Sequence, residues 1–158
     1  MPETYRLRGI RVRPLSHQQI ANTAISVCKT FKLSRKKSKS FDHFFESLYL
    51  LGIELKVEES DEWLYLTKGL CDPKRKEILV PEHIYQNACI GEQEALSVMF
   101  HEIGHLFLNH SPYLHFSDVN PKIEEDAEWQ ADTFSDVALE YLGYNPDQLR
   151  QLSFDFSK

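Results

Sequence analysis

Two histidines four residues apart, set within an apolar stretch, constrain this chain more than any other feature. They belong to the run HEIGH at 101–105, with apolar residues on both sides. A helix places residues four apart on one face, because each residue turns the helix by about 100°. Buried polar side chains need partners. The pattern therefore predicts a central, mostly buried helix over 92–109, whose two imidazoles share a ligand.

A zinc ion suits His101 and His105. Neutral imidazole nitrogens bind Zn²⁺ at about 2.0–2.1 Å, and a catalytic site adds a third protein ligand and keeps one position open. Glu102 lies beside the ion rather than on it. There its carboxylate can take a proton from a water that the metal activates and pass it to the leaving amine. The sequence thus predicts one catalytic Zn²⁺ with Glu102 as the general base.

His110 is one candidate for the third ligand. It lies nine residues after His101, which puts it on about the opposite face of a continuous helix. The extended motif that uses a third histidine also needs Gly and His where this chain has Leu108 and Ser111. We therefore expect His110 to be a helix-end residue that faces the C-terminal dipole.

A predicted acidic helix over 122–142 is the better source of a ligand. Three of its acids share a face, so one carboxylate could bind the metal while another accepts a hydrogen bond from a histidine N–H. Acids in a first helical turn are also favoured by the helix dipole alone. The spacing leaves five candidates: Glu124, Glu125, Asp126, Glu128 and Asp132.

The remaining pattern predicts an α+β fold in one domain over 1–158, with an irregular lead-in over 1–15. A small, largely antiparallel three-stranded sheet is expected to pack on a helical core. Its strands are predicted at 53–58, 63–67 and 78–80, and further helices at 17–31, 40–51, 81–88 and from about Asp147. Gly104 costs a helix about 1 kcal/mol relative to Ala, which indicates that another element packs closely there.

Composition narrows the setting. Hydrophobic residues make up 42% and charged residues 27% of the chain, as in ordinary globular domains. No apolar run approaches the roughly 18 residues of a membrane span, and the N-terminus lacks the apolar core of a signal peptide. The three cysteines, Cys28, Cys71 and Cys89, form no CxxC pair, so we expect reduced thiols. These features predict a cytoplasmic protein without membrane contact.

The charge is unevenly distributed along the chain. Residues 1–40 hold ten Lys or Arg and one acid, although the whole chain has a net charge of −6. The basic residues between 6 and 39 could contact nucleic acid weakly or dock a partner. A solvated basic face is the plainer interpretation, since the cluster at 35–39 lacks interleaved aromatics and matches no DNA-reading motif.

Four segments together resemble the ImmA/IrrE family of metallopeptidases over about residues 12–136. They are HEIGH with the helix before it, EWQADTF at 128–134, RPLS at 13–16, and PEHIY at 81–85 with the hairpin before it. The resemblance implies a gluzincin-like zinc site with Glu128 as third ligand and Asp132 supporting a ligand from behind. The chain departs from the family after Phe134, where it lacks the usual Leu-Leu-Met-Pro run, and at Phe100, where Ala is common.

The resemblance also implies a role. Members of the family act as bacterial, phage or mobile-element regulators that cleave a transcriptional repressor. The expected partner is therefore a separate protein substrate, such as a helix-turn-helix repressor or an antitoxin. Tyr113 and His115, in the loop after the zinc helix, are candidates for stabilising the oxyanion. The alternative is a non-proteolytic zinc-fold regulator, toxin or antirepressor that acts by protein or DNA binding, although such a module does not need Glu102.

Overall fold

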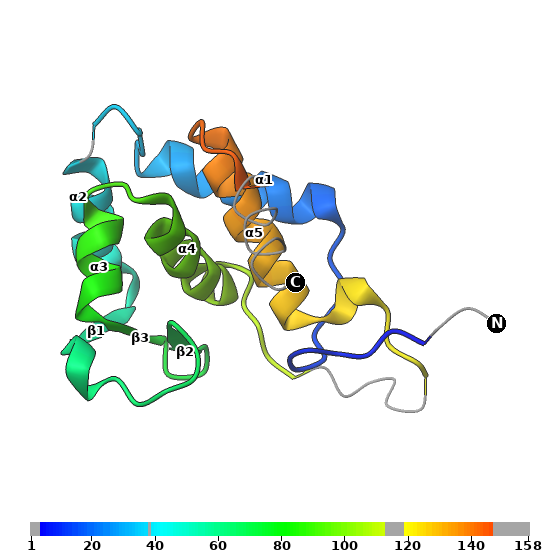
Figure 1. Cartoon of the computed structure of the whole chain (residues 1–158). Coiled ribbons are helices and arrows are strands. Elements are labelled where there is room, and N and C mark those ends of the chain that lie inside the picture. Colours follow the sequence, from blue (N-terminus) through cyan, green and yellow to red (C-terminus); the bar gives the residue numbers. More distant parts are fainter. Residues whose placement is uncertain (1–3, 38, 113–118, 147–158) are drawn as a thin grey trace, which may run out of the picture.

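The computed structural model describes residues 4–37, 39–112 and 119–146, and Figure 1 shows the arrangement of the elements. The helices in these ranges are α1 (His17–Thr30), α2 (Lys39–Ser47), α3 (Glu82–Cys89), α4 (Gln93–Phe107) and α5 (Ala127–Tyr141). Short 3-10 helices cover Leu48–Leu51, Ser60–Glu62 and Ile123–Glu125. The strands are β1 (Glu54–Glu58), β2 (Leu70–Asp72) and β3 (Glu77–Pro81). The α+β class is thereby confirmed. The predicted last helix, from about Asp147, lies outside the described residues.

The helices pack around α4 and α5. Helix α4 contacts α3 and α5, and α1 packs on α5 as well (Figure 1). The sheet lies beside α3 and the N-terminal part of the chain beside α5 (Figure 1). The largest fully buried side chains of this core are Phe41, Phe44, Phe45, Phe100, Phe134, Ile20, Leu48, Ile78, Leu96, Met99, Ile103 and Leu139.

Local signals fix two of the helix ends. The Ser16 hydroxyl accepts a hydrogen bond from the backbone N–H of Gln19 at 3.1 Å, and the Gln19 side chain accepts one from the Ser16 N–H at 2.9 Å. This capping box satisfies two donors that a helix start leaves open. Gly52, at φ 77°, ends the segment that runs from α2 through the following 3-10 turn. Both boundaries agree with the sequence prediction.

The sheet has three strands, as predicted, but is mixed, whereas largely antiparallel pairing was expected. Its order is β1-β3-β2, with β2 antiparallel and β1 parallel to β3. A tight turn, in which Asp72 accepts hydrogen bonds from the N–H groups of Lys74 and Arg75, joins β2 to β3 and forces them antiparallel. The long connection over 59–69 lets β1 reach the other edge of β3 in a parallel direction.

The predicted strand over 63–67 is a loop. The Trp63 indole N–H donates to the Thr67 carbonyl at 2.8 Å, which closes the segment on itself. Leu64 and Leu66, which alternation would place on a buried face, are 89% and 106% exposed. The strand that does pair with β3 is β2, a few residues further on.

Gly104 allows α4 and α5 to approach each other closely. A Cβ at this position would lie 3.0 Å from Cδ1 and 3.1 Å from Cβ of Phe134, which is fully buried on α5. The predicted close packing against this glycine is thereby confirmed. The contact fixes the distance between the two helices that carry the candidate ligands.

Two further observations concern the setting of the protein. No helix within the described ranges combines the length and the apolar character that crossing a bilayer requires. Cys28, Cys71 and Cys89 are free thiols, and burial raises the pKa of Cys28 to about 12. A thiol with so high a pKa stays protonated and unreactive at neutral pH.

Candidate metal centre

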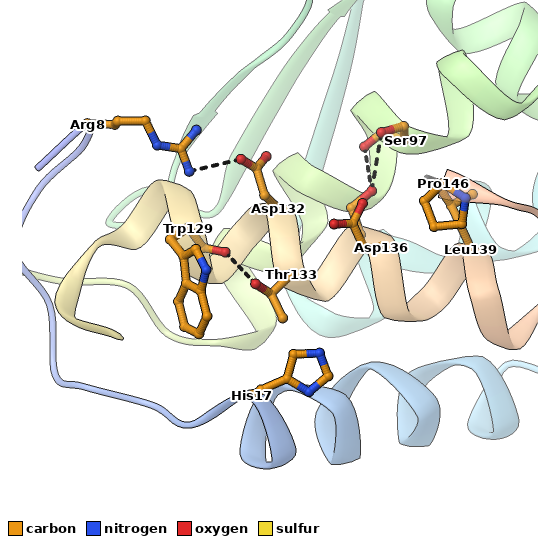
Figure 2. Close-up of a pocket in the computed structure, with 10 residues that line it drawn as sticks. Arg8, His17, Ser97, Trp129, Asp132, Thr133, Asp136, Leu139 and Pro146 are labelled. Atoms are coloured by element: carbon orange, nitrogen blue, oxygen red, sulfur yellow. Dashed lines mark hydrogen bonds and ion pairs between the residues drawn. The ribbon is translucent and has the colours of Figure 1, made fainter. Parts of the chain in front are cut away.

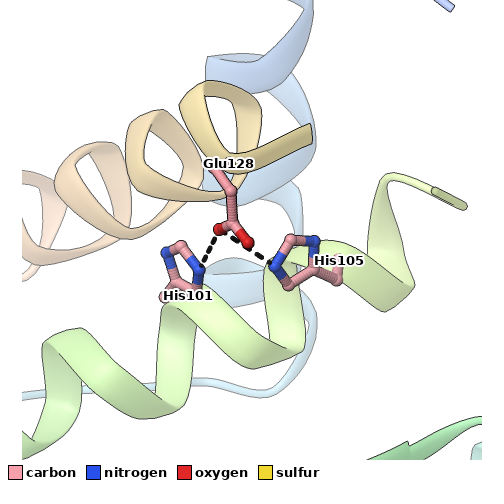
Figure 3. A group of neighbouring side chains, drawn as sticks. All are labelled: His101, His105 and Glu128. Atoms are coloured by element: carbon pink, nitrogen blue, oxygen red, sulfur yellow. Dashed lines mark ion pairs between the residues drawn. The ribbon is translucent and has the colours of Figure 1, made fainter. Parts of the chain in front are cut away.

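His101, His105 and Glu128 bring three potential ligand atoms together between α4 and α5 (Figure 3). Glu128 Oε2 lies 2.7 Å from His101 Nε2 and 3.5 Å from His105 Nε2. All three atoms lie within 4.8 Å of one another. The histidines lie one helical turn apart on α4, and Glu128 lies in the first turn of α5. Two imidazole nitrogens and a carboxylate are a donor set that suits a divalent metal such as zinc.

The other acids near the start of α5 have different partners. Glu125 forms an ion pair with Arg11 at 2.7 Å, and both side chains are largely buried. Asp126 caps α5 by accepting from the N–H of Glu128 at 2.9 Å. One group of described His, Cys, Asp or Glu side chains is placed to hold an ion, and it consists of His101, His105 and Glu128. Glu125, Asp126 and Cys71 do not belong to it. Of the five acids that the spacing left open, Glu128 is the one that faces both histidines.

Asp132 supports His101 from behind. Its Oδ1 lies 2.8 Å from His101 Nδ1, while its Oδ2 pairs with Arg8 Nη2 at 3.0 Å. A carboxylate on Nδ1 holds the proton there and leaves Nε2 free for a metal. The Arg8–Asp132 pair lines a cavity of about 570 Å³ that also includes Trp129 and Thr133 (Figure 2). Asp132 therefore contacts one of the two candidate histidine ligands.

His110 does not lie on the opposite helix face, so that prediction was wrong. Helix α4 ends at Phe107, and Asn109 adopts a left-handed conformation at φ 54°. This turn brings the N–H of His110 to the carbonyl of His105 at 3.0 Å. The two Nδ1 atoms then lie 2.8 Å apart, and His110 is only 5% exposed. Counting residues along a continuous helix could not predict the contact between His105 and His110, because the chain changes direction at Asn109.

Glu102 lies beside the three ligand atoms rather than among them. Its Oε1 is 3.9 Å from His101 Nε2, and the residue is only 7% exposed. Burial raises the pKa of Glu102, although the nearby His101 and His105 oppose the shift. Gly69, just before β2, leaves room for this side chain, since a Cβ there would lie 3.1 Å from Glu102 Cγ. A buried carboxylate with a raised pKa is suited to accept and return a proton near neutral pH.

The N-terminal strap, residues 5–13, holds the start of α5. The Tyr5 hydroxyl and the N–H groups of Arg8 and Gly9 all donate to the buried Asp126 carboxylate, at 2.6, 2.8 and 3.2 Å. Gly9 also lies against Glu128, since a Cβ at Gly9 would be 2.7 Å from Glu128 Cγ. The sequence predicted only an irregular lead-in with basic residues in this segment. Its role at the site was missed because each contact joins residues more than a hundred positions apart.

Tyr113 and His115, the oxyanion candidates, lie outside the described residues.

A helix that presents two histidines and a buried glutamate to a carboxylate on a neighbouring helix defines a metallopeptidase-type site. The chain belongs to the family Peptidase_M78, described as the IrrE N-terminal-like domain, whose model matches residues 53–143, more than half of the chain. The match includes α4, α5 and the whole sheet, while the strap and α1 lie before it. No curated protein and no solved structure matches the chain. The family assigns the chain a metallopeptidase-type function.

Proposed function

We propose that the protein is a zinc-dependent metalloendopeptidase. His101, His105 and Glu128 are the ligands, and Glu102 is the general base. The observation that carries the proposal is the convergence of the three ligand atoms within 4.8 Å, with the Glu102 carboxylate 3.9 Å from one of them. Two imidazoles and one carboxylate leave a fourth position open, as a catalytic zinc site requires.

The chain's own residues account for the proton transfers. Bound zinc would supply Lewis acidity and lower the pKa of the attacking water. Glu102 accepts a proton from that water as its oxygen adds to the peptide carbonyl carbon. Glu102 then delivers the proton to the nitrogen as the C–N bond breaks. Asp132 keeps His101 in one orientation throughout, through the hydrogen bond at Nδ1.

The proposed substrate is a protein, namely a transcriptional repressor of the helix-turn-helix class in a bacterial, phage or mobile-element system. The resemblance to ImmA/IrrE metallopeptidases supports this choice. Three residues of the basic N-terminal region have partners within the chain: Arg8 with Asp132, Arg11 with Glu125, and Arg35 with the ring of Tyr144. The proposal therefore does not depend on contact with nucleic acid.

A comparison of new protein N-termini in cells tests the proposal. Cells expressing the wild type should contain cleavage products that cells expressing Glu102→Gln lack, because the amide cannot accept the proton. Purified Glu102→Gln should still bind one zinc ion, whereas a His101→Ala control should lose both metal and cleavage. If wild type and Glu102→Gln give the same biological response and no specific new N-termini, the protein acts by binding instead.

A further inference from the structure

On the side of His105 away from Glu128, His105 and two further buried side chains form a continuous hydrogen-bonded relay. His105 Nδ1 lies 2.8 Å from His110 Nδ1, and His110 Nε2 lies 2.7 Å from Gln130 Oε1. The Gln130 amide nitrogen donates to the carbonyls of Arg13 and Glu124, at 2.8 and 2.7 Å. The relay therefore connects α4, the turn after it, α5, the 3-10 helix before α5 and the end of the strap.

Gln130 sets the direction of this relay. A backbone carbonyl can only accept hydrogen bonds, and the Gln130 amide nitrogen faces two of them. The other amide atom, Oε1, must therefore be the one that faces His110, and it too can only accept. It follows that His110 Nε2 carries a hydrogen and donates it to Gln130.

One proton lies between the two Nδ1 atoms, and burial decides its position. If it were on His110, that ring would be a cation, at a site only 5% exposed. Within the described residues, no carboxylate forms an ion pair with His110, and an isolated buried charge is costly. The proton therefore resides on His105 Nδ1, and His110 stays neutral. This leaves His105 Nε2 as the nitrogen that faces Glu128 and is available to a metal.

We propose that Gln130 and His110 are positioning residues that lock His105 in its metal-binding tautomer; this rests on the proposed metal site. Without such a partner, a histidine populates both neutral tautomers, including the one with hydrogen on Nε2. In that tautomer Nε2 has no lone pair for a metal. Asp132 does the same for His101 through a single contact, whereas His105 depends on two further side chains. The role needs an amide at 130 in particular, since the residue must donate on one side and accept on the other.

Zinc affinity, measured by competition with a chromogenic chelator, tests the relay. His110→Leu and Gln130→Met should bind zinc about 10–100-fold more weakly, as is usual when a partner of a metal ligand is removed. His110→Asn should recover most of the affinity, because its Oδ1 can stand where Nδ1 stood and accept from His105. Ser135→Ala is the matched control: it removes another buried hydrogen bond of α5, to the Ser97 carbonyl, away from the relay.

Nitrogen-15 NMR of the imidazoles in the metal-free protein tests the tautomer directly. We expect hydrogen on Nδ1 of His105 in the wild type and in His110→Asn, and a shift towards Nε2–H in His110→Leu. Hydrogen on Nε2 of His105 in the wild type, or unchanged zinc affinity in both His110→Leu and Gln130→Met, would overturn the relay. Failure of the wild type to bind zinc would instead refute the proposed function, while the tautomer result would still stand.

Discussion

His101 is held by two carboxylates at once, Asp132 at Nδ1 and Glu128 at Nε2. Burial on its own would lower the pKa of His101, but the hydrogen bonds to Asp132 and Glu128 outweigh it and raise the pKa to about 10. In the metal-free protein the imidazole is therefore protonated at neutral pH. The hydrogen on His101 Nε2 then points at the Glu128 carboxylate and occupies the position between the two side chains that a bound metal would take.

The stability of the metal-free protein should consequently depend on pH. The pKa of His101 rises from 6.5 to about 10 on folding, so its contribution is complete below pH 6.5 and is lost as the pH rises towards 10. Urea unfolding in chelator should show a free energy of unfolding that falls by up to about 1.4 kcal/mol per pH unit between pH 7 and 9. Asp132→Asn should flatten this dependence. An equal slope in both proteins would contradict the assignment.

The two contacts of Asp132 should differ in importance. Arg8 and Asp132 are 54% and 44% exposed, so water screens their ion pair and it contributes at most about 1 kcal/mol. Arg8→Met should therefore weaken zinc binding less than about 5-fold, whereas Asp132→Ala should weaken it about 10–100-fold by freeing His101. Isothermal titration with zinc measures both. Equal losses would mean that Arg8, rather than His101, is the partner that matters.

At the level of the elements, the contact between α4 and α5 sets the geometry of the site. Gly104→Ala would place a methyl group 3.0 Å from the Phe134 ring. Alanine favours a helix by about 1 kcal/mol over glycine, but overpacking a core costs about 1–3 kcal/mol. We expect lower thermal stability together with weaker zinc binding, because the helices must separate.

A second substitution provides the control for Gly104→Ala. Adding Phe134→Leu makes room for the methyl group, so the double variant should bind zinc more tightly than Gly104→Ala alone. Calorimetric melting and chelator competition report the two effects separately. A more stable Gly104→Ala with unchanged zinc affinity would show that the glycine does not set the helix spacing.

The contact of the strap with Glu128 leads to a prediction about zinc affinity rather than stability. A methyl group at position 9 would lie 2.7 Å from Glu128 Cγ, so in Gly9→Ala this flexible side chain must move away from its ligand position. We expect weaker zinc binding with little change in the melting temperature of the metal-free protein. Ile10→Ala is the matched control, because Ile10 is 46% exposed and its truncation adds no atom near the site. Equal zinc affinity in the wild type, Gly9→Ala and Ile10→Ala would exclude a role for the strap in positioning Glu128.

Sequence patterns predicted the parts of the molecule that depend on neighbours along the chain. Helix α4 with His101 and His105 follows from spacing and burial, and the capped start of α1 follows from Ser16. The pairing of β1 was not predictable, because alternation does not say which edge of β3 is free. His110 was misplaced for a related reason: a left-handed turn at Asn109, rather than helical periodicity, decides where its side chain lies.

At the scale of the whole molecule, the site connects three distant parts of the chain: the strap, α4 and the start of α5. Zinc should therefore stabilise these parts together. Hydrogen–deuterium exchange should slow on adding zinc at residues 5–13, 101–110 and 126–132, and change little in β1, β2 and β3. Uniform protection of the whole chain would indicate global stabilisation instead, and would argue against a site that ties these three segments together.

The strap has a consequence for biosynthesis. Tyr5 and the carboxylate that it binds, Asp126, are 121 residues apart in sequence. On the ribosome, residues 5–13 are made long before α5, so they have no docking partner while most of the chain is being translated. A nascent polypeptide that stops short of α5 also lacks Glu128 and Gln130. The proposed metal site can therefore form only late in synthesis, once the start of α5 has left the exit tunnel.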